Sequence, residues 1–118
     1  GNADVEQSER SVVFTFVKTE LEESVADLSD AHSNLPGEYY GRITKPVAYF
    51  LLAKLALNAE IYTDDNWTDG SKPDGKTIKF TVDGAEKNAW EATIAYGTKI
   101  KELGYQWPIT CFQLLYEK

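Results

Sequence analysis

Oxygen-bearing side chains gather between residues 63 and 75, and they are the first candidates for chemistry. Four aspartates and one asparagine lie there: Asp64, Asp65, Asn66, Asp69 and Asp74. Carboxylate and amide oxygens are the ligands that Ca²⁺ prefers. An EF-hand loop does not fit, because counting from Asp65 places Trp67 at the third position and Lys76 at the twelfth. The stretch is also dense in turn-forming residues, so we interpret it as a solvated loop without a metal.

An aromatic side chain beside carboxylates and amides indicates a second chemistry, the binding of sugars. Sugar rings present flat apolar faces next to hydroxyl groups, and these suit an exposed aromatic ring flanked by hydrogen-bonding groups. Two polar stretches carry such aromatics, and the candidate ligand-binding residues are Trp67, Asp65, Asn66, Tyr39 and Tyr40. The alternative is that Trp67 folds down onto the helices and anchors its loop.

Catalysis is not predicted. Glycoside hydrolysis needs two carboxyl groups, and two adjacent pairs exist: Glu22-Glu23 and Asp64-Asp65. Both lie in polar stretches, where nothing indicates the burial that raises the pKa of a general acid. His32 and Cys111 are the only histidine and cysteine, which excludes a Cys/His metal cluster and an internal disulfide. We interpret His32 as a loop histidine and expect no cofactor.

The charge is unevenly distributed along the chain. The net charge is −7, and residues 1–38 hold nine acidic and two basic side chains, whereas the rest balances ten against ten. Nucleic-acid binding needs a basic surface, so it is not expected. The acidic first third is interpreted as a solvated helix face.

The longest weakly polar run, Thr44 to Tyr62, predicts a central helix. Thr44 suits the N-cap, where its hydroxyl accepts from a backbone N–H, and Pro46 suits the first turn. The spacing defines one large apolar face (Val47, Phe50, Leu51, Leu55, Asn58, Ile61) and one face of smaller side chains (Ala48, Leu52, Ala56, Ala59). A helix apolar on most sides is expected to be buried on most sides. A membrane span does not fit, because Lys54 interrupts a run already shorter than about 20 residues.

A helix is also predicted before the central one, from Gln7 or Ser8 to about Leu28. Its expected apolar stripe is Val13, Phe16 or Val17, Leu21, Val25 and Leu28. Its acidic side chains, expected to face largely away from that stripe, are Glu20, Glu22, Glu23 and Asp27. Residues 29–42 and 63–75 are predicted as loops because they are rich in Ser, Asn, Asp, Pro and Gly.

A short β element is predicted next, because Lys76–Val82 alternates polar and apolar side chains and Asp83-Gly84 is a strong turn pair. We expect a small hairpin or an edge strand, with the region of the Asp65–Trp67 loop as its candidate partner.

A third long helix is expected from Glu86 or Asn88 to Leu103. Asn88 suits its N-cap, Gly104 suits its C-terminal stop, and Trp90 is predicted to be a core residue. The tail 105–118 favours a helix after Pro108, with a strand as the alternative.

Two segments together resemble the SusD/RagB family of bacterial outer-membrane lipoproteins. They are Gly41–Tyr62, reading GRITKPVAYFLLAKLALNAEIY, and Asn88–Tyr105, reading NAWEATIAYGTKIKELGY. The loop Asp65–Gly75 indicates the starch-binding branch. Family members are several times longer and carry a lipidated N-terminal cysteine, so this chain corresponds to their helical part alone, without the lipid anchor. The leading Gly1 also suggests a longer parent, and no signal peptide opens the chain.

The resemblance implies a mainly α fold: three to four helices in tetratricopeptide-like hairpins, with a short β element in an insertion at 63–87. Residues 1–118 would form one helical domain. The implied function is non-catalytic binding and uptake of starch-type oligosaccharides at the outer-membrane surface, with a TonB-dependent transporter as partner. The alternative is a helical scaffold that docks the transporter and holds no sugar itself.

Overall fold

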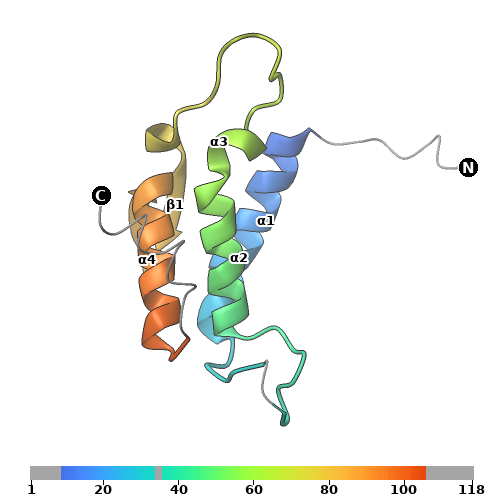
Figure 1. Cartoon of the computed structure of the whole chain (residues 1–118), viewed down its shortest axis with the longest axis vertical. Helices are drawn as coiled ribbons and strands as arrows, with labels where there is room; N and C mark the ends of the chain where they lie inside the picture. The colour runs from blue at the N-terminus through green and yellow to red at the C-terminus, as the bar shows by residue number, and fades with distance from the viewer. Residues whose placement is uncertain (1–8, 34–35, 106–118) are drawn as a thin grey trace, which may run out of the picture.

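The structure is a computed structural model that describes residues 9–33 and 36–105, and it is mainly helical with one short β-hairpin (Figure 1). The α-helices are α1 (Arg10–Ser24), α2 (Lys45–Leu57), α3 (Ala59–Tyr62) and α4 (Ala89–Glu102). Two 3₁₀ turns, η1 (Val25–Asp27) and η2 (Gly75–Thr77), and two strands, β1 (Lys79–Val82) and β2 (Ala85–Asn88), complete it. The predicted fold class, mainly α with a short β element within 63–87, is confirmed. No helix among these residues is long and apolar enough to cross a membrane.

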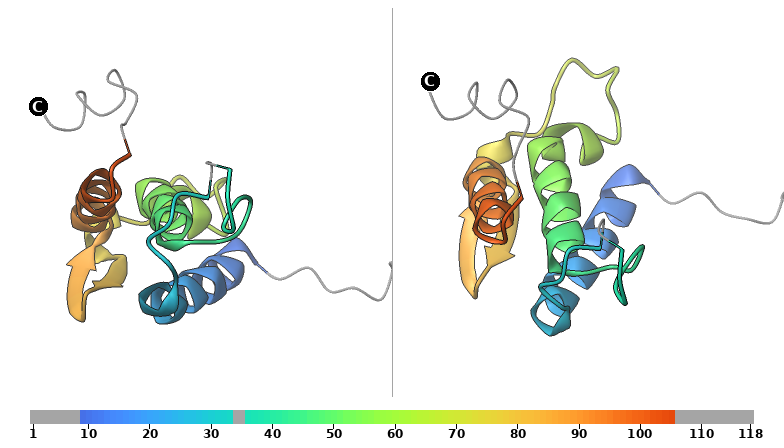
Figure 2. Two further views of the ribbon diagram at one scale, coloured as in Figure 1. Left: turned by 90° about the horizontal axis from the view of Figure 1, so that it is seen from below. Right: turned by 60° about the horizontal axis from the view of Figure 1, so that its bottom comes forward.

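Helix α2 is central, and α1 and α4 run antiparallel to it on two sides (Figure 1). The contact between α2 and α4 is the largest in the structure, and β1 packs against both α1 and α4 (Figure 2). The hairpin therefore fills the space that α1 and α4 leave open beside α2.

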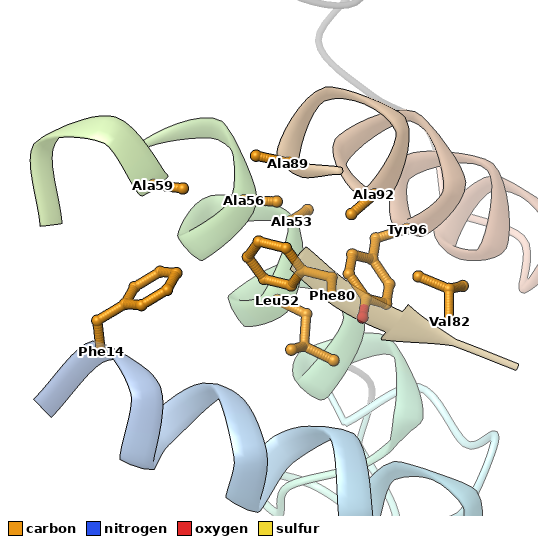
Figure 3. Close-up of a cluster of buried hydrophobic side chains, with 10 residues drawn as sticks. All are labelled: Phe14, Leu52, Ala53, Ala56, Ala59, Phe80, Val82, Ala89, Ala92 and Tyr96. Atoms are coloured by element: carbon orange, nitrogen blue, oxygen red, sulfur yellow. The ribbon is translucent and has the colours of Figure 1, made fainter. Parts of the chain in front are cut away.

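The core lies where these elements meet (Figure 3). Its buried side chains are Phe14, Leu52, Ala53, Ala56, Ala59, Phe80, Val82, Ala89, Ala92 and Tyr96. Phe80 occupies the middle at 1% exposure, with its ring edge-on to Phe14 at 5.9 Å and to Tyr96 at 6.4 Å between centroids. Small residues of α2 and α4 face each other, so the two helices pack closely.

The predicted apolar stripe of the first helix is wrong in its first half, because α1 is rotated to face the hairpin, whereas Leu21 packs against the core as predicted. Phe14 is buried, whereas Val13 and Phe16 are exposed. The Lys18 ammonium lies 5.3 Å from the centre of the Phe80 ring and donates to the Lys79 carbonyl at 2.6 Å. One turn on, the Glu22 carboxylate accepts from the Thr81 backbone N–H, so Glu22 does not face away as expected. These two side chains satisfy backbone groups on the open edge of β1.

The central helix is buried on one face only, so the expectation of burial on most sides is also wrong. The small face, Ala48, Leu52, Ala56 and Ala59, is fully buried. Phe50, Leu51 and Leu57 on the other face are exposed. Helices α1 and α4 pack on the buried side of α2, and Leu51 and Leu57 remain exposed on the other side.

The start of α2 is where the sequence places it, but its cap differs. Thr44 takes the N-cap position and Pro46 lies in the first turn. The Thr44 side chain makes no capping hydrogen bond, and its buried hydroxyl oxygen has no partner among the described residues. The Ser29 carbonyl instead accepts from the Lys45 N–H at 2.7 Å.

The β element is a hairpin, and its partner strand corrects the prediction. β1 pairs antiparallel with β2, with Val82 opposite Ala85, and not with the Asp65–Trp67 region. Asp83 and Gly84 both have positive φ, 53° and 79°, which a two-residue turn between twisted strands requires. The strand is also shorter than predicted, because residues 75–77 form a 3₁₀ turn.

Helix α4 begins and ends as predicted, and local hydrogen bonds explain both ends. Asn88 and Glu91 form a capping box, with bonds of 2.9 and 3.0 Å. At the other end Gly104 has φ 94°, and the N–H groups of Gly104 and Tyr105 bond the carbonyls of Lys101 and Ile100. Trp90, predicted as core, is 36% exposed. The predictions for the tail concern residues 106–118 and lie outside the described residues.

Candidate ligand pocket beside Trp67

The loop between α3 and η2 is shaped by its own polar side chains. Each of four side chains accepts from a backbone N–H two residues on: Asp64 from Asn66, Asn66 from Thr68, Asp69 from Ser71 and Asp74 from Lys76. Such bonds hold successive turns without any helix or strand. Each bond uses one oxygen of the side chain that accepts it. The described residues contain no group of three His, Cys, Asp or Glu side chains that could hold a metal.

Asp65 ties the loop to the start of α1. One carboxylate oxygen accepts from the Ser11 backbone N–H at 3.0 Å, and the other accepts from the Ser11 hydroxyl. Glu9, at the N-cap position, makes no capping bond with its side chain, so Asp65 takes that role from a distant part of the chain. The hydrogen bonds from the Ser11 hydroxyl and N–H lower the pKa of Asp65 below its ordinary value of 3.8.

We predict that this tether opens in acid. Because the pKa of Asp65 is lower in the folded chain, its contribution to stability is present above pH 3.8 and is lost as the pH falls through the lowered pKa. An NMR titration of the Ser11 amide proton should show this transition with a midpoint below 3.8. An Asp65→Asn variant should lack the transition, and a wild-type midpoint at or above 3.8 would contradict the prediction.

Glu60 holds the other end of the loop. Its carboxylate accepts from the Gly75 N–H at 2.8 Å and pairs with the Lys72 ammonium at 3.3 Å. The indole of Trp90 lies so close to Gly75 that an added Cβ would approach it to 2.5 Å. The loop is therefore fixed at both ends, against α1 and against α3.

A pocket of about 300 Å³ opens between this loop and the helices. Its walls are Arg10, Leu57, Asn58, Glu60, Ile61, Asp64, Trp67 and Lys72. Trp67 is 77% exposed, so its ring does not fold onto the helices, and the alternative role as a loop anchor is wrong. Leu57 and Ile61 form the apolar wall of the pocket, and charged and amide side chains line the rest of it. The Arg10 guanidinium donates to the Asp64 carbonyl at 3.1 Å and so joins α1 to this wall.

The five predicted site residues do not form one site. Tyr39 and Tyr40 are exposed in the loop at the opposite end of α2 from Trp67 (Figure 1). The Asn66 side chain accepts from Thr68 within the loop, and Asp65 caps α1. Of the five, only Trp67 lines the pocket.

Sequence reasoning missed the other walls of the pocket. Ile61 was assigned to the large apolar face of the central helix and Leu57 to neither face, and their position in the last two turns before the loop is the signal that could have placed them here. Arg10 and Lys72 carry no such signal, because only the folding of the loop against α1 and α3 brings them together.

A second, apolar pocket of about 210 Å³ lies at the far end of the helices, lined by Ser33, Pro46, Val47, Phe50, Ile100 and Tyr105. Beside it, His32 Nε2 bonds the Leu103 carbonyl at 2.6 Å, and the His32 ring stacks on Tyr105 at 4.2 Å. His32 is thus a loop histidine, as predicted, and it fastens the segment that follows η1 to the end of α4.

Comparisons with protein-family models, with curated proteins and with solved structures found no match for this chain. The fold and the pocket define a mainly helical protein with an exposed tryptophan beside a pocket lined by apolar and charged side chains. The resemblance to SusD/RagB proteins stays a prediction.

Proposed function

We propose that this chain is a non-catalytic glycan-binding module of the SusD/RagB type, acting at the bacterial outer-membrane surface. The observation that carries the proposal is the exposure of Trp67 beside the 300 Å³ pocket. Solvent exposure of so large an apolar ring has a cost that a ligand face can remove. The pocket volume is at the lower end of the range for small-molecule sites, which suits part of an oligosaccharide.

The groups around Trp67 fit the hydroxyl groups of a sugar. Arg10 and Lys72 are donors, Asp64 is an acceptor, and the Asn58 amide contains both kinds of group. The tethers at Asp65 and Glu60 hold the loop before any ligand arrives. Less ordering is then needed on binding, which favours affinity. In this proposal the sugar stacks on Trp67 and is passed to a TonB-dependent transporter.

Trp67→Ala is expected to weaken binding of maltooligosaccharides at least tenfold, because truncating an aromatic anchor costs about 2 kcal/mol or more. Isothermal titration calorimetry measures the affinity without relying on the removed fluorophore. Tyr40→Ala is the matched control, since it removes an exposed ring at the other end of α2. No heat at millimolar sugar would overturn the proposal for this chain. Equal affinity of wild type and Trp67→Ala for the sugar would show that the sugar binds elsewhere than in this pocket.

A second candidate function is a helical scaffold that docks the transporter. Two observations favour it: the exposed side chains of Leu51 and Leu57 on α2, and an exposed apolar patch on α1. Contiguous exposed apolar side chains are typical of protein interfaces. A pull-down from an outer-membrane extract should recover a transporter with this chain as bait, and its absence from the captured material would count against docking.

A further inference from the structure

The outer face of α1 carries an apolar patch on its first two turns. Four large side chains lie there: Val12 at 57% exposure, Val13 at 48%, Phe16 at 65% and Val17 at 37%. They are neighbours on the helix surface, since residues three and four apart lie side by side. The helix has already buried its other face, through Phe14 and Leu21, against the core. Among residues 9–33 and 36–105 nothing covers this patch, which leaves it open to another molecule.

The same face becomes acidic along the helix. Val13, Phe16, Glu20 and Glu23 follow each other at intervals of three and four, so the stripe changes from apolar to carboxylate in its third turn. Glu20 and Glu23 are exposed, and Asp27 in η1 continues the stripe. Within residues 9–33 and 36–105, none of these three carboxylates forms an ion pair.

Both cations of α1 point elsewhere. Arg10 donates to the Asp64 carbonyl and Lys18 to the Lys79 carbonyl, on the side that faces the loop and the hairpin. The outer face therefore combines apolar side chains with negative charge only.

We infer that the outer face of α1 is a docking surface for a basic amphipathic helix of another protein. That helix would place apolar side chains on Val13 and Phe16 and lysine or arginine side chains opposite Glu20 and Glu23. Opposite charges at the rim of an interface increase the association rate and select the partner. The inference rests on the scaffold function proposed above and names the chemistry of the partner.

Charge argues against two other occupants. An anionic membrane surface would be repelled by the carboxylates. A second copy is also disfavoured along the full length of α1: a parallel pair sets carboxylates against carboxylates, and an antiparallel pair in full register sets each apolar half against an acidic half.

The test uses two synthetic helical peptides that share a face of leucines and differ in the following turn, which carries either three lysines or three glutamates. Fluorescence anisotropy should show binding of the lysine peptide, weakened by raising the NaCl concentration from 50 to 300 mM. Glu20→Lys/Glu23→Lys should bind it at least tenfold more weakly and should prefer the glutamate peptide. Phe16→Ser should also bind the lysine peptide at least tenfold more weakly.

Matched controls sit away from α1. Glu38→Lys/Glu102→Lys changes the net charge equally, and Ile94→Ser removes an exposed apolar side chain from α4. Circular dichroism and urea midpoints confirm that each variant is folded. Equal losses in controls and α1 variants, or an unchanged peptide preference after charge reversal, would overturn the inference.

The remaining outcomes distinguish the proposed partner from other occupants, and the α1 surface from the scaffold function. Binding to neutral lipid vesicles without peptide binding, or self-association abolished by Phe16→Ser, would replace the proposed partner by a membrane or by a second copy. If the transporter pull-down succeeds equally with wild type and Phe16→Ser, the scaffold function stands and the α1 surface is excluded. If it recovers nothing while the peptide binds as described, the transporter is the wrong partner and the α1 surface stands.

Discussion

Phe80→Ala is expected to lower the free energy of unfolding by about 3–5 kcal/mol, the usual cost of removing a fully buried phenyl ring. Phe80 is 1% exposed and contacts Phe14 of α1 and Tyr96 of α4, so no single neighbour can move in to fill the space. Urea denaturation followed by circular dichroism measures the loss. The free energy of unfolding of a small domain is about 5–15 kcal/mol, so a fraction of the variant should be unfolded at moderate temperature.

The control for Phe80→Ala is Phe16→Ala, the same chemical change at an exposed site. Surface substitutions of this kind usually change stability by less than about 0.5 kcal/mol. If the free energy of unfolding fell by the same amount in both variants, the hairpin would not belong to the core.

Ala92→Leu is expected to lower the free energy of unfolding by about 3 kcal/mol, because the larger side chain overpacks the contact between α2 and α4. Ala92 is fully buried, and Ala53 and Ala56 lie across from it on α2 (Figure 3), so the added atoms must push the helices apart or displace Tyr96. Thermal unfolding should show a clear decrease in Tm.

Ala26→Leu, at an exposed position of η1, is the matched control and should leave Tm nearly unchanged. An Ala92→Leu variant as stable as wild type would mean that the two helices are not closely packed there.

Local signals in the sequence predicted the ends of elements well. The capping pair Asn88 and Glu91, the Gly104 stop and the Asp83-Gly84 turn each act through hydrogen bonds or φ angles within a few residues. Such signals do not depend on the rest of the fold. These ends could therefore be predicted from the chain itself, whereas the start and the partner of β1 and the division of the central helix into α2 and α3 could not.

The faces of the helices could not be predicted in the same way. Hydrophobicity alone favoured Val13 and Phe16 as the buried side of α1, but the hairpin needs polar partners for the edge of β1. Lys18 and Glu22 provide them, and this fixes the rotation of α1 with Phe14 inward. The deciding interaction is about sixty residues away in sequence, so periodicity within α1 does not contain it.

In the candidate site, too, local signals could be predicted from the sequence and distant contacts could not. Trp67 was identified from its polar surroundings, which are local. Asp65 has the same surroundings, yet it became the cap of α1 because that helix begins beside the loop. Tyr39 and Tyr40 were grouped with Trp67 by residue type, but α2 separates the two loops along its full length (Figure 1).

The position of Phe80 and Val82 has a consequence for how this chain can be altered. Both lie within residues 63–87, the stretch that interrupts an otherwise helical hairpin, and both belong to the core. A shortened chain in which a tight turn joins α3 directly to α4 would expose Phe14 and Tyr96 to water. The interruption is thus a structural requirement of the domain, because β1 completes the core whether or not the Trp67 loop binds a ligand.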